Sequence, residues 1–218
     1  MTSTTPIRVT RPGARRVAVL GAGSWGTTFS KVLADGGADV AIWARRPELA
    51  REIAEGKRNS DYLPGINLPR TLWASSVVEE VLDEAEMVFV SIPSQSLRQN
   101  LVAVRDMIPR DAIIVSLMKG VERGTARRMS EVIREELHAD PAQVAVISGP
   151  NLALEIAKEE PTASVVSSEN LETATLVAMA ARTNYLRSFV NTDVVGTEFG
   201  GVLKNLIAVA IGIVDGVG

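Results

Sequence analysis

The chain has no cysteine and only one histidine, His138, among its 218 residues. The absence of cysteine excludes disulfides, thiolate nucleophiles and cysteine-ligated zinc or iron–sulfur centres. A single histidine likewise excludes a metal site built from several imidazoles, so we expect no metal. Proton transfer in any reaction of this chain must therefore fall to lysine, carboxylate or tyrosine side chains.

The chain also has no excess of positive charge. Its 23 Lys and Arg residues stand against 26 Asp and Glu residues, which gives a formal net charge of −3. General binding to a phosphate backbone needs a basic surface, so we expect no nucleic acid partner. Hydrophobic residues make up 46% of the sequence, which is enough to fill a sizeable core and excludes a disordered chain.

Long hydrophobic runs are absent as well. The most apolar stretch, residues 206–214, is far shorter than the ~20 residues of a membrane span. Residues 1–15 carry several positive charges but no apolar segment like that of a signal peptide. We therefore predict no transmembrane segment, a cytoplasmic location and a disordered lead-in over residues 1–15.

From Arg16 onward, short β-branched apolar runs alternate with longer amphipathic stretches, which is typical of a parallel sheet covered by helices. The predicted strands are residues 17–20, 39–44, 72–74, 87–92, 112–117, 144–148, 163–167 and 185–190. The pattern predicts an α/β fold, a Rossmann-like doubly wound sheet over residues 16–193.

A long apolar, glycine-containing helical pattern fills residues 194–218, with no strand after it. A lone helix cannot bury its apolar face. It either packs back on the sheet or begins a second domain whose remainder the sequence does not include. Its apolar face also predicts a partner surface, such as that of a homodimer.

Three glycines follow the first predicted strand in the spacing G-x-G-x-x-G: Gly21, Gly23 and Gly26. The first allows a tight turn, the second lets backbone approach a pyrophosphate, and the third brings the next helix close to the strand. The N–H groups at the start of that helix favour phosphate. Because the triplet lies between a strand and a helix, we predict a dinucleotide-binding loop; the alternative is a turn without a ligand.

Two arginines, Arg45 and Arg46, follow the second predicted strand. NAD-selective sites carry an acidic residue here, which accepts hydrogen bonds from the ribose 2′-hydroxyl. Guanidinium groups suit a 2′-phosphate instead, so we expect NADP(H) to be preferred over NAD(H) as cofactor. In the alternative, both arginines are solvated turn residues.

Two lysines are candidates for the chemistry. Lys119 follows the predicted strand 112–117, at the edge where ligands of open α/β sheets bind; otherwise it is a surface loop residue. Lys204 lies in the apolar helical pattern, where burial of its amine favours a general acid/base. The alternative for Lys204 is a side chain that reaches solvent. Asn205 beside it could orient a polar group or pair with backbone.

Seven segments form a longer pattern over nearly the whole chain. They are GAGSWGT at 21–27, WARRPE at 43–48, YLPGINLP at 62–69, SIPSQSLR at 91–98, SLMKGVE at 116–122, VISGPNLALEIA at 146–157 and GGVLKNLIAVAIGIVDGVG at 200–218. In this order they resemble the NAD(P)-dependent glycerol-3-phosphate dehydrogenases of bacterial type. The glycine triplet alone indicates only a dinucleotide binder, whereas the seven segments together are highly specific.

The resemblance implies reversible reduction of dihydroxyacetone phosphate to sn-glycerol 3-phosphate, which supplies the backbone for phospholipid synthesis. Lys204 matches the lysine that exchanges the proton at the carbinol oxygen, and Lys119 matches a residue shared by cofactor and substrate. The other implied cofactor contacts are Ser24, Trp25, Arg45, Arg46, Tyr62 and Ala153. The other substrate candidates are Gly149, Asn151 and Asn205, and many bacterial members carry a hydroxyl residue at the position of Asn151.

The resemblance also implies that residues 194–218 begin an all-α C-terminal domain. Family members continue beyond the position of Gly218 through helices that supply further substrate contacts. We therefore expect the parent protein to be the dehydrogenase and the 218-residue chain alone to be deficient in turnover. Two other hypotheses remain open: a fragment that binds NADPH without catalysis, and a dehydrogenase of another small hydroxy acid.

Overall fold

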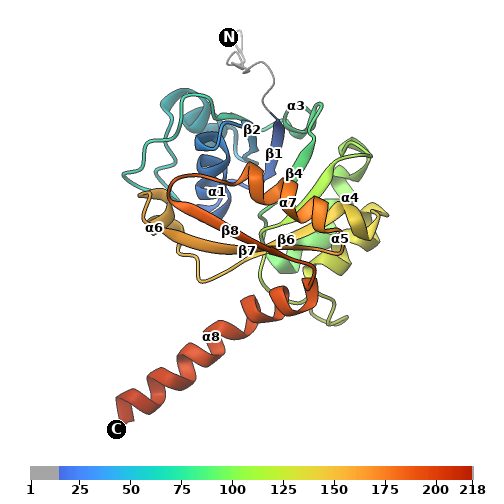
Figure 1. Ribbon diagram of the computed structural model, residues 1–218. Helices are drawn as coiled ribbons and strands as arrows, with labels where there is room; N and C mark the ends of the chain where they lie inside the picture. Colours follow the sequence, from blue (N-terminus) through green and yellow to red (C-terminus); the bar gives the residue numbers. More distant parts are fainter. Residues whose placement is uncertain (1–14, 218) are drawn as a thin grey trace.

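Eight strands form one sheet in the order β3-β2-β1-β4-β5-β6-β7-β8 (Figure 1). The computed structural model describes residues 15–217, without the side chain of Asn205, so the predicted lead-in lies outside the described residues except for Arg15. The strands are β1 Arg16–Leu20, β2 Asp39–Trp43, β3 Trp73–Ser75, β4 Met87–Val90, β5 Ile113–Ser116, β6 Val144–Ser148, β7 Thr162–Ser168 and β8 Leu186–Asn191. All eight predicted strands are confirmed, each within two residues of its predicted ends.

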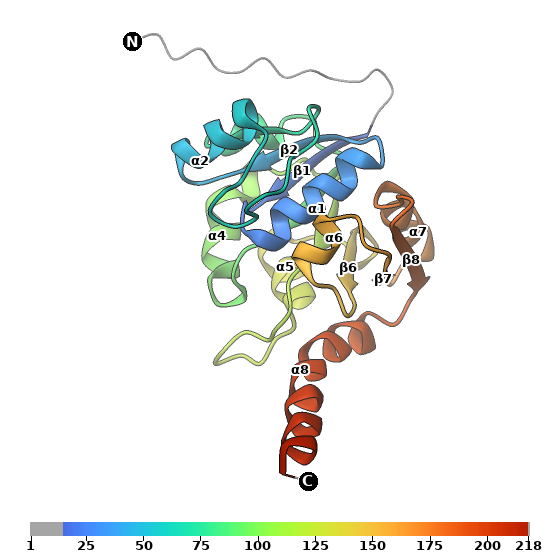
Figure 2. The ribbon, with the colours of Figure 1, turned by 90° about the vertical axis from the view of Figure 1, so that its left-hand side faces the viewer.

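The sheet is mixed, which corrects the prediction of a wholly parallel sheet. Strands β1 to β6 run parallel, but β7 pairs antiparallel with β6, and β8 is parallel to β7. The chain between β6 and β7 contains only the short helix α6, Ala153–Ala157, which stays beside the first half of α1 (Figure 2). The chain therefore enters β7 from the end of the sheet at which it left β6.

Helices cover both faces of the sheet, as a doubly wound fold requires. The remaining α-helices are α1 Ser24–Asp35, α2 Pro47–Arg51, α3 Val78–Leu82, α4 Leu97–Val104, α5 Met129–Leu137, α7 Leu171–Ala180 and α8 Val194–Val217. Single turns of other helix types are η1 Glu52–Gly56, η2 Ser94–Ser96, η3 Arg105–Met107 and η4 Pro141–Gln143. Helices α1, α6 and α7 pack on one face, and α3, α4 and α5 pack on the other.

Alternation along β1 separates the two halves of the core. Val17 and Val19 face the layer of α1, whereas Ala18 and Leu20 face the layer of α4 and α5. On the α1 side, Phe29 packs against Phe89, with ring centroids 5.6 Å apart. Both phenylalanines are fully buried, so this aromatic pair ties α1 to the middle of the sheet.

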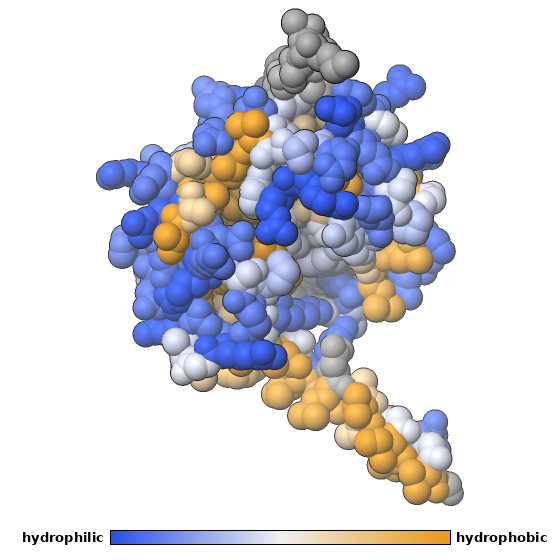
Figure 3. Space-filling model, turned by 180° about the vertical axis from the view of Figure 1, so that it is seen from behind, coloured by the Kyte–Doolittle hydropathy of each residue, from blue (hydrophilic) through white to orange (hydrophobic). Residues whose placement is uncertain are grey.

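Helix α8 confirms the predicted long helical segment but leaves the body of the protein as an exposed apolar rod (Figure 3). It is long and apolar enough to cross a membrane. An 18-residue stretch within it has a mean hydropathy of 1.6, and only 6% of that stretch is buried. The sequence analysis considered only the shorter run 206–214 and therefore predicted no transmembrane segment. The criterion is one of length and composition only, and core helices of soluble proteins also meet it. The boundary between domains at residue 194 remains a prediction.

The aromatic core yields a stability prediction. Phe29→Ala should lower the free energy of unfolding by about 3–5 kcal/mol, because it removes a fully buried ring and leaves a cavity. Phe189→Ala is the matched control, since Phe189 is 53% exposed on β8, and it should cost about 1 kcal/mol or less. Urea unfolding followed by circular dichroism measures both. Equal losses in the two variants would contradict the assignment of Phe29 to the core.

Candidate functional site

The strand order places a crevice at the carboxyl ends of β1 and β4. The chain winds outward from β1 in one direction through β2 and β3, and in the other through β4 and β5. Ligands of open α/β sheets bind at such a switch point. A cavity of about 650 Å³ opens there. Its lining includes eight of the predicted site residues: Gly21, Gly23, Ser24, Trp25, Arg45, Arg46, Tyr62 and Lys119.

The glycine triplet has the geometry that a dinucleotide loop needs. Gly21 has a φ of +113°, and a Cβ there would clash with the carbonyl oxygen of Ser91. A Cβ on Gly26 would clash with the carbonyl oxygen of Gly21, so only glycine lets α1 approach the turn this closely. A Cβ on Gly23 would meet nothing within 4 Å, and that open space lies at the start of α1. The loop therefore fits a pyrophosphate beside the first N–H groups of α1.

Asn59 holds this loop in place, although the sequence analysis missed it. Its side chain is fully buried, and Nδ2 donates to the carbonyl oxygen of Ala22 at 3.0 Å and to Oγ1 of Thr27 at 2.7 Å. Its Oδ1 accepts from the backbone N–H of Tyr62 at 3.2 Å. Asn59 thus joins the glycine loop to the segment that carries Tyr62. Its surroundings in the sequence, Arg-Asn-Ser-Asp, resemble an exposed turn, so no local signal marked it.

The two arginines differ in their surroundings. Both are exposed beyond β2, and Arg46 forms an ion pair with Asp61 and lies 5.9 Å from the ring centroid of Tyr62. Arg45 has no ion pair within residues 15–217. A phosphate at Arg46 would therefore compete with the carboxylate of Asp61, whereas Arg45 has no such competitor among the described residues. The sequence analysis predicted both arginines as cofactor contacts, but it did not identify Asp61 as a competitor for the guanidinium group of Arg46.

Lys119 connects the first cavity to a second one. Its Nζ donates to the carbonyl oxygen of Gly149 at 2.9 Å. Gly149 and Lys204 both line the second cavity, of about 460 Å³, between the end of β6 and the start of α8. At Gly201 a Cβ would clash with Oγ of Ser148, so α8 lies directly against the end of β6. The structure therefore brings Lys119, Gly149 and Lys204 together, as the sequence analysis expects.

The two lysines influence one another electrostatically. Lys119 is exposed as a whole residue, but its ammonium group is partly buried. This burial lowers the pKa of Lys119, and the positive charge of Lys204 lowers it further. Lys204 itself is half-buried. Amines at two adjoining cavities can donate protons and hydrogen bonds to an oxygen atom and can attract an anion.

The remaining predicted site residues differ in how they relate to the two cavities. Asn151 is close to Gly149, and its amide nitrogen and oxygen are buried without a hydrogen-bond partner among the described residues, so the amide could bind a ligand. Ala153 begins α6, where its carbonyl oxygen accepts from Thr28, and it is not in the lining of either cavity. The side chain of Asn205 lies outside the described part of the chain.

Glu198 is a second residue that the sequence analysis missed. The residue is only 8% exposed. Its carboxylate accepts hydrogen bonds from the backbone N–H of Ser130 at 2.9 Å, from Ser130 Oγ at 2.6 Å and from Arg128 at 2.7 Å. These bonds attach the first turns of α8 to the start of α5. Glu198 thereby sets the direction in which α8 presents Lys204 to the cavity. A glutamate in an apolar helix was a signal for such an anchor.

Alanine substitutions at two glycines of the loop should have different effects, one on stability and the other on cofactor binding. Gly26→Ala should lower the free energy of unfolding by about 1–3 kcal/mol, because its methyl group has to displace backbone. Gly23→Ala should leave stability within about 0.5 kcal/mol of the parent but weaken NADPH binding about tenfold, because its methyl group enters space left for the ligand. Urea unfolding and quenching of the intrinsic tryptophan fluorescence by NADPH measure the two effects. Undiminished NADPH affinity in Gly23→Ala would contradict the role of the loop.

The comparison with protein families matches residues 16–174 to the family described as NAD-dependent glycerol-3-phosphate dehydrogenase N-terminus. Among the structures that resemble this fold is glycerol-3-phosphate dehydrogenase from Coxiella burnetii. It is 33% identical in sequence, with a TM-score of 0.84 over 94% of this chain and 62% of that one. The shared fold includes the mixed eight-stranded sheet.

Two similar curated proteins are named glycerol-3-phosphate dehydrogenase [NAD(P)+]. The one from Leifsonia xyli subsp. xyli is 68% identical over 92% of this chain, and the one from Corynebacterium glutamicum is 53% identical over 93%. The chain spans 54% of the length of the first and 61% of the second. From the match over residues 16–174, the chain belongs to the NAD-dependent glycerol-3-phosphate dehydrogenase family.

Proposed function

We propose that the chain takes part in the reduction of dihydroxyacetone phosphate to sn-glycerol 3-phosphate with NAD(P)H, for glycerophospholipid synthesis. The observation that carries the proposal is the position of Lys119. It lines the cavity at the glycine loop and donates to Gly149, which lines the cavity of Lys204. A cofactor and a substrate bound in these two cavities would meet at Lys119. The second candidate is a chain that binds NADPH without catalysis, because it spans only part of its relatives.

The roles of the residues follow from what each can donate. A bound nicotinamide supplies the hydride, and Lys204 donates a proton to the substrate oxygen as negative charge develops there. Lys119 adds positive charge beside the phosphorylated substrate. The buried amide of Asn151 and the backbone of Gly149 are proposed substrate contacts, together with Asn205.

The proposed cofactor contacts surround the first cavity. They are Gly21, Gly23, Ser24, Trp25, Gly26, Arg45, Arg46, Tyr62, Lys119 and Ala153. Of these, Trp25 is held by a 3.1 Å hydrogen bond from Nε1 to the carbonyl oxygen of Leu117. The bond keeps the indole at the wall shared by the glycine loop and the segment of Lys119. Gly26 and Ala153 are the contacts with the weakest support, because both lie outside the lining of the cavity.

We propose NADP(H) as the preferred cofactor, with NAD(H) also accepted. The support is Arg45, which lines the cavity and has no carboxylate partner in residues 15–217. Asp61 favours the opposite preference, because a 2′-phosphate near Arg46 must displace or repel its carboxylate. The proposed preference therefore depends mainly on Arg45.

We also propose a cytoplasmic location and, through the exposed apolar side chains of α8, assembly with a second copy of the chain. The substrate and cofactor are small molecules, and the net charge of −3 offers no general surface for nucleic acid.

The proposed reaction has a direct test. NADPH oxidation by the purified chain should be slow, because the chain spans only part of its relatives, but it should depend on dihydroxyacetone phosphate. Lys204→Ala should lower that rate about 10²–10⁴-fold, because it removes the proton donor. Lys158→Ala, at an exposed lysine outside both cavities, should keep the parent rate. A parent chain that binds NADPH but never oxidises it would reject catalysis by this chain and support the binding fragment.

Cofactor preference is tested by titration. Arg45→Ala should weaken NADPH binding about tenfold and leave NADH binding nearly unchanged, since only NADPH carries the phosphate that Arg45 would bind. Arg51→Ala, at the exposed end of α2, is the control and should alter neither affinity. If Arg45→Ala keeps the parent ratio of NADPH to NADH affinity, the 2′-phosphate role is wrong.

A further inference from the structure

The segment that carries Lys119 is a loop, residues 117–128, between β5 and α5. Its outer part closes on itself: the N–H of Glu122 donates to the carbonyl oxygen of Arg127 at 2.8 Å, and Val121 pairs with Arg128. Gly120 has a φ of +138°, and a Cβ there would lie 3.1 Å from Oγ of Ser94. The loop therefore turns sharply just after Lys119 and lies against η2.

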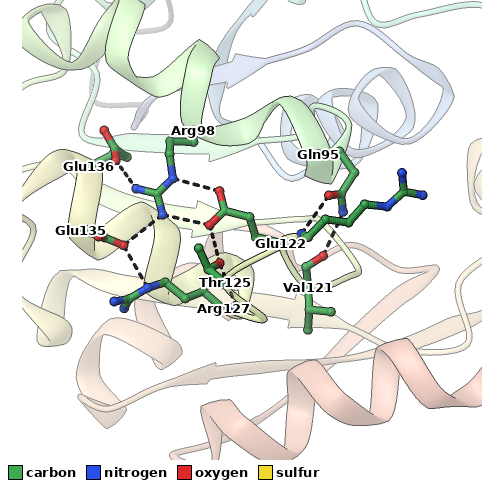
Figure 4. Close-up of polar contacts among 9 residues, drawn as sticks. Gln95, Arg98, Val121, Glu122, Thr125, Arg127, Glu135 and Glu136 are labelled. Atoms are coloured by element: carbon green, nitrogen blue, oxygen red, sulfur yellow. Dashed lines mark hydrogen bonds and ion pairs between the residues drawn. The ribbon is translucent and has the colours of Figure 1, made fainter.

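One arginine of α4 joins this loop to α5 (Figure 4). Nε and Nη2 of Arg98 donate to the two carboxylate oxygens of Glu122, each at 2.9 Å. Nη2 also donates to Glu135 at 3.0 Å, and Nη1 donates to Glu136. We call these four residues the Arg98 cluster. Arg127 of the loop contacts Glu135 at 3.2 Å, so two arginines face the three carboxylates.

Gln95 of η2 clamps the backbone of the same loop. Its Nε2 donates to the carbonyl oxygen of Val121 at 2.9 Å, and its Oε1 accepts from the N–H of Arg123 at 3.0 Å (Figure 4). The side-chain amide thus pairs with the loop as a neighbouring strand would. The clamp begins two residues after Lys119.

The cluster is stronger than ordinary surface ion pairs. Exposed single pairs contribute little to stability, but here the geometry is bidentate and the side chain of Glu122 is only 15% exposed. The hydrogen bonds from Arg98 lower the pKa of Glu122 to about 2. Glu122 therefore stays ionised, and the pair with Arg98 stays closed, at every pH at which Lys119 could titrate.

We propose that Arg98 and Gln95 are positioning residues for Lys119: they hold loop 117–128 so that the ammonium group of Lys119 stays beside Gly149, between the two cavities. Neither side chain is bonded to Lys119, so both act through the loop. Without these contacts the loop gains conformational freedom, which competes with the 2.9 Å bond from Lys119 to Gly149. The value of this position for ligand binding rests on the proposed function.

The test measures where Lys119 lies, apart from activity. In the 218-residue chain, competitive acetylation from pH 7 to 11, quantified by mass spectrometry, compares Lys119 with the exposed Lys158. Because partial burial lowers the pKa of Lys119, its amine should become reactive below the pH range of an ordinary lysine. In Arg98→Ala, Arg98→Lys and Gln95→Ala, the reactivity of Lys119 should move to higher pH, with Lys158 as the internal reference for the reagent, and NADPH binding should weaken roughly tenfold.

Arg98→Lys separates geometry from charge, because lysine keeps the charge but cannot bind Glu122 through two parallel hydrogen bonds. Arg134→Ala is the matched control: it breaks one exposed ion pair of α5, with Glu169, and should leave the titration of Lys119 unchanged. Circular dichroism confirms that each variant is folded. If Arg98→Ala does not fold, Gln95→Ala, which removes no charge, decides the question.

An unchanged Lys119 titration in folded Arg98→Ala and Gln95→Ala proteins would overturn the inference. The same upward movement in Arg134→Ala would also overturn it, since any lost ion pair would then suffice. A parent chain that does not bind NADPH would defeat the proposed function, but the acetylation measurement would still decide whether Arg98 and Gln95 position Lys119.

Discussion

The contact between the start of α1 and the turn after β1 is the constraint on which the site depends. A Cβ on Gly26 would clash with the carbonyl oxygen of Gly21, and a Cβ on Gly21 would clash with Ser91, at the end of β4. Helix and sheet can meet here only through bare backbone. That close contact directs the first N–H groups of α1 into the crevice between β1 and β4, and buried Asn59 holds the turn from the other side.

The second half of the site is built by long-range polar anchors. Loop 117–128 is held by Arg98 and Gln95, and its last residue, Arg128, donates to Glu198 of α8. The loop that carries Lys119 is therefore attached through Arg98 to the last turn of α5, and the helix that carries Lys204 is attached through Glu198 to its first turn. A shift of α5 would move both lysines relative to the glycine loop, which is attached to the opposite layer.

The features predicted correctly from the sequence are those that depend on neighbouring residues and on the backbone. The eight strands were found because apolar β-branched runs are distinct in composition, and the glycine loop was found because its turn requires residues without a Cβ. The direction of β7 was missed, because a strand pattern reads the same in both directions and a short connection such as α6 allows either. Asn59, Arg98 and Glu198 were missed as functional residues because their partners lie far along the chain, and a polar residue shows its partner only after folding. Asp61 was missed for the same reason.

Within the described residues Lys119 and Lys204 form no ion pair, whereas the cations that anchor the surrounding structure do. Arg98, Arg128 and the buried Lys31 each have acidic partners, but Lys119 donates only to a carbonyl oxygen. The carboxylate of Asp193, in the lining of the second cavity, accepts from the N–H of Gly196 at the start of α8. Burial lowers the pKa of Lys119, and repulsion from the charge of Lys204 lowers it further. A phosphorylated ligand would offset that repulsion, so the arrangement favours an anion beside the two lysines.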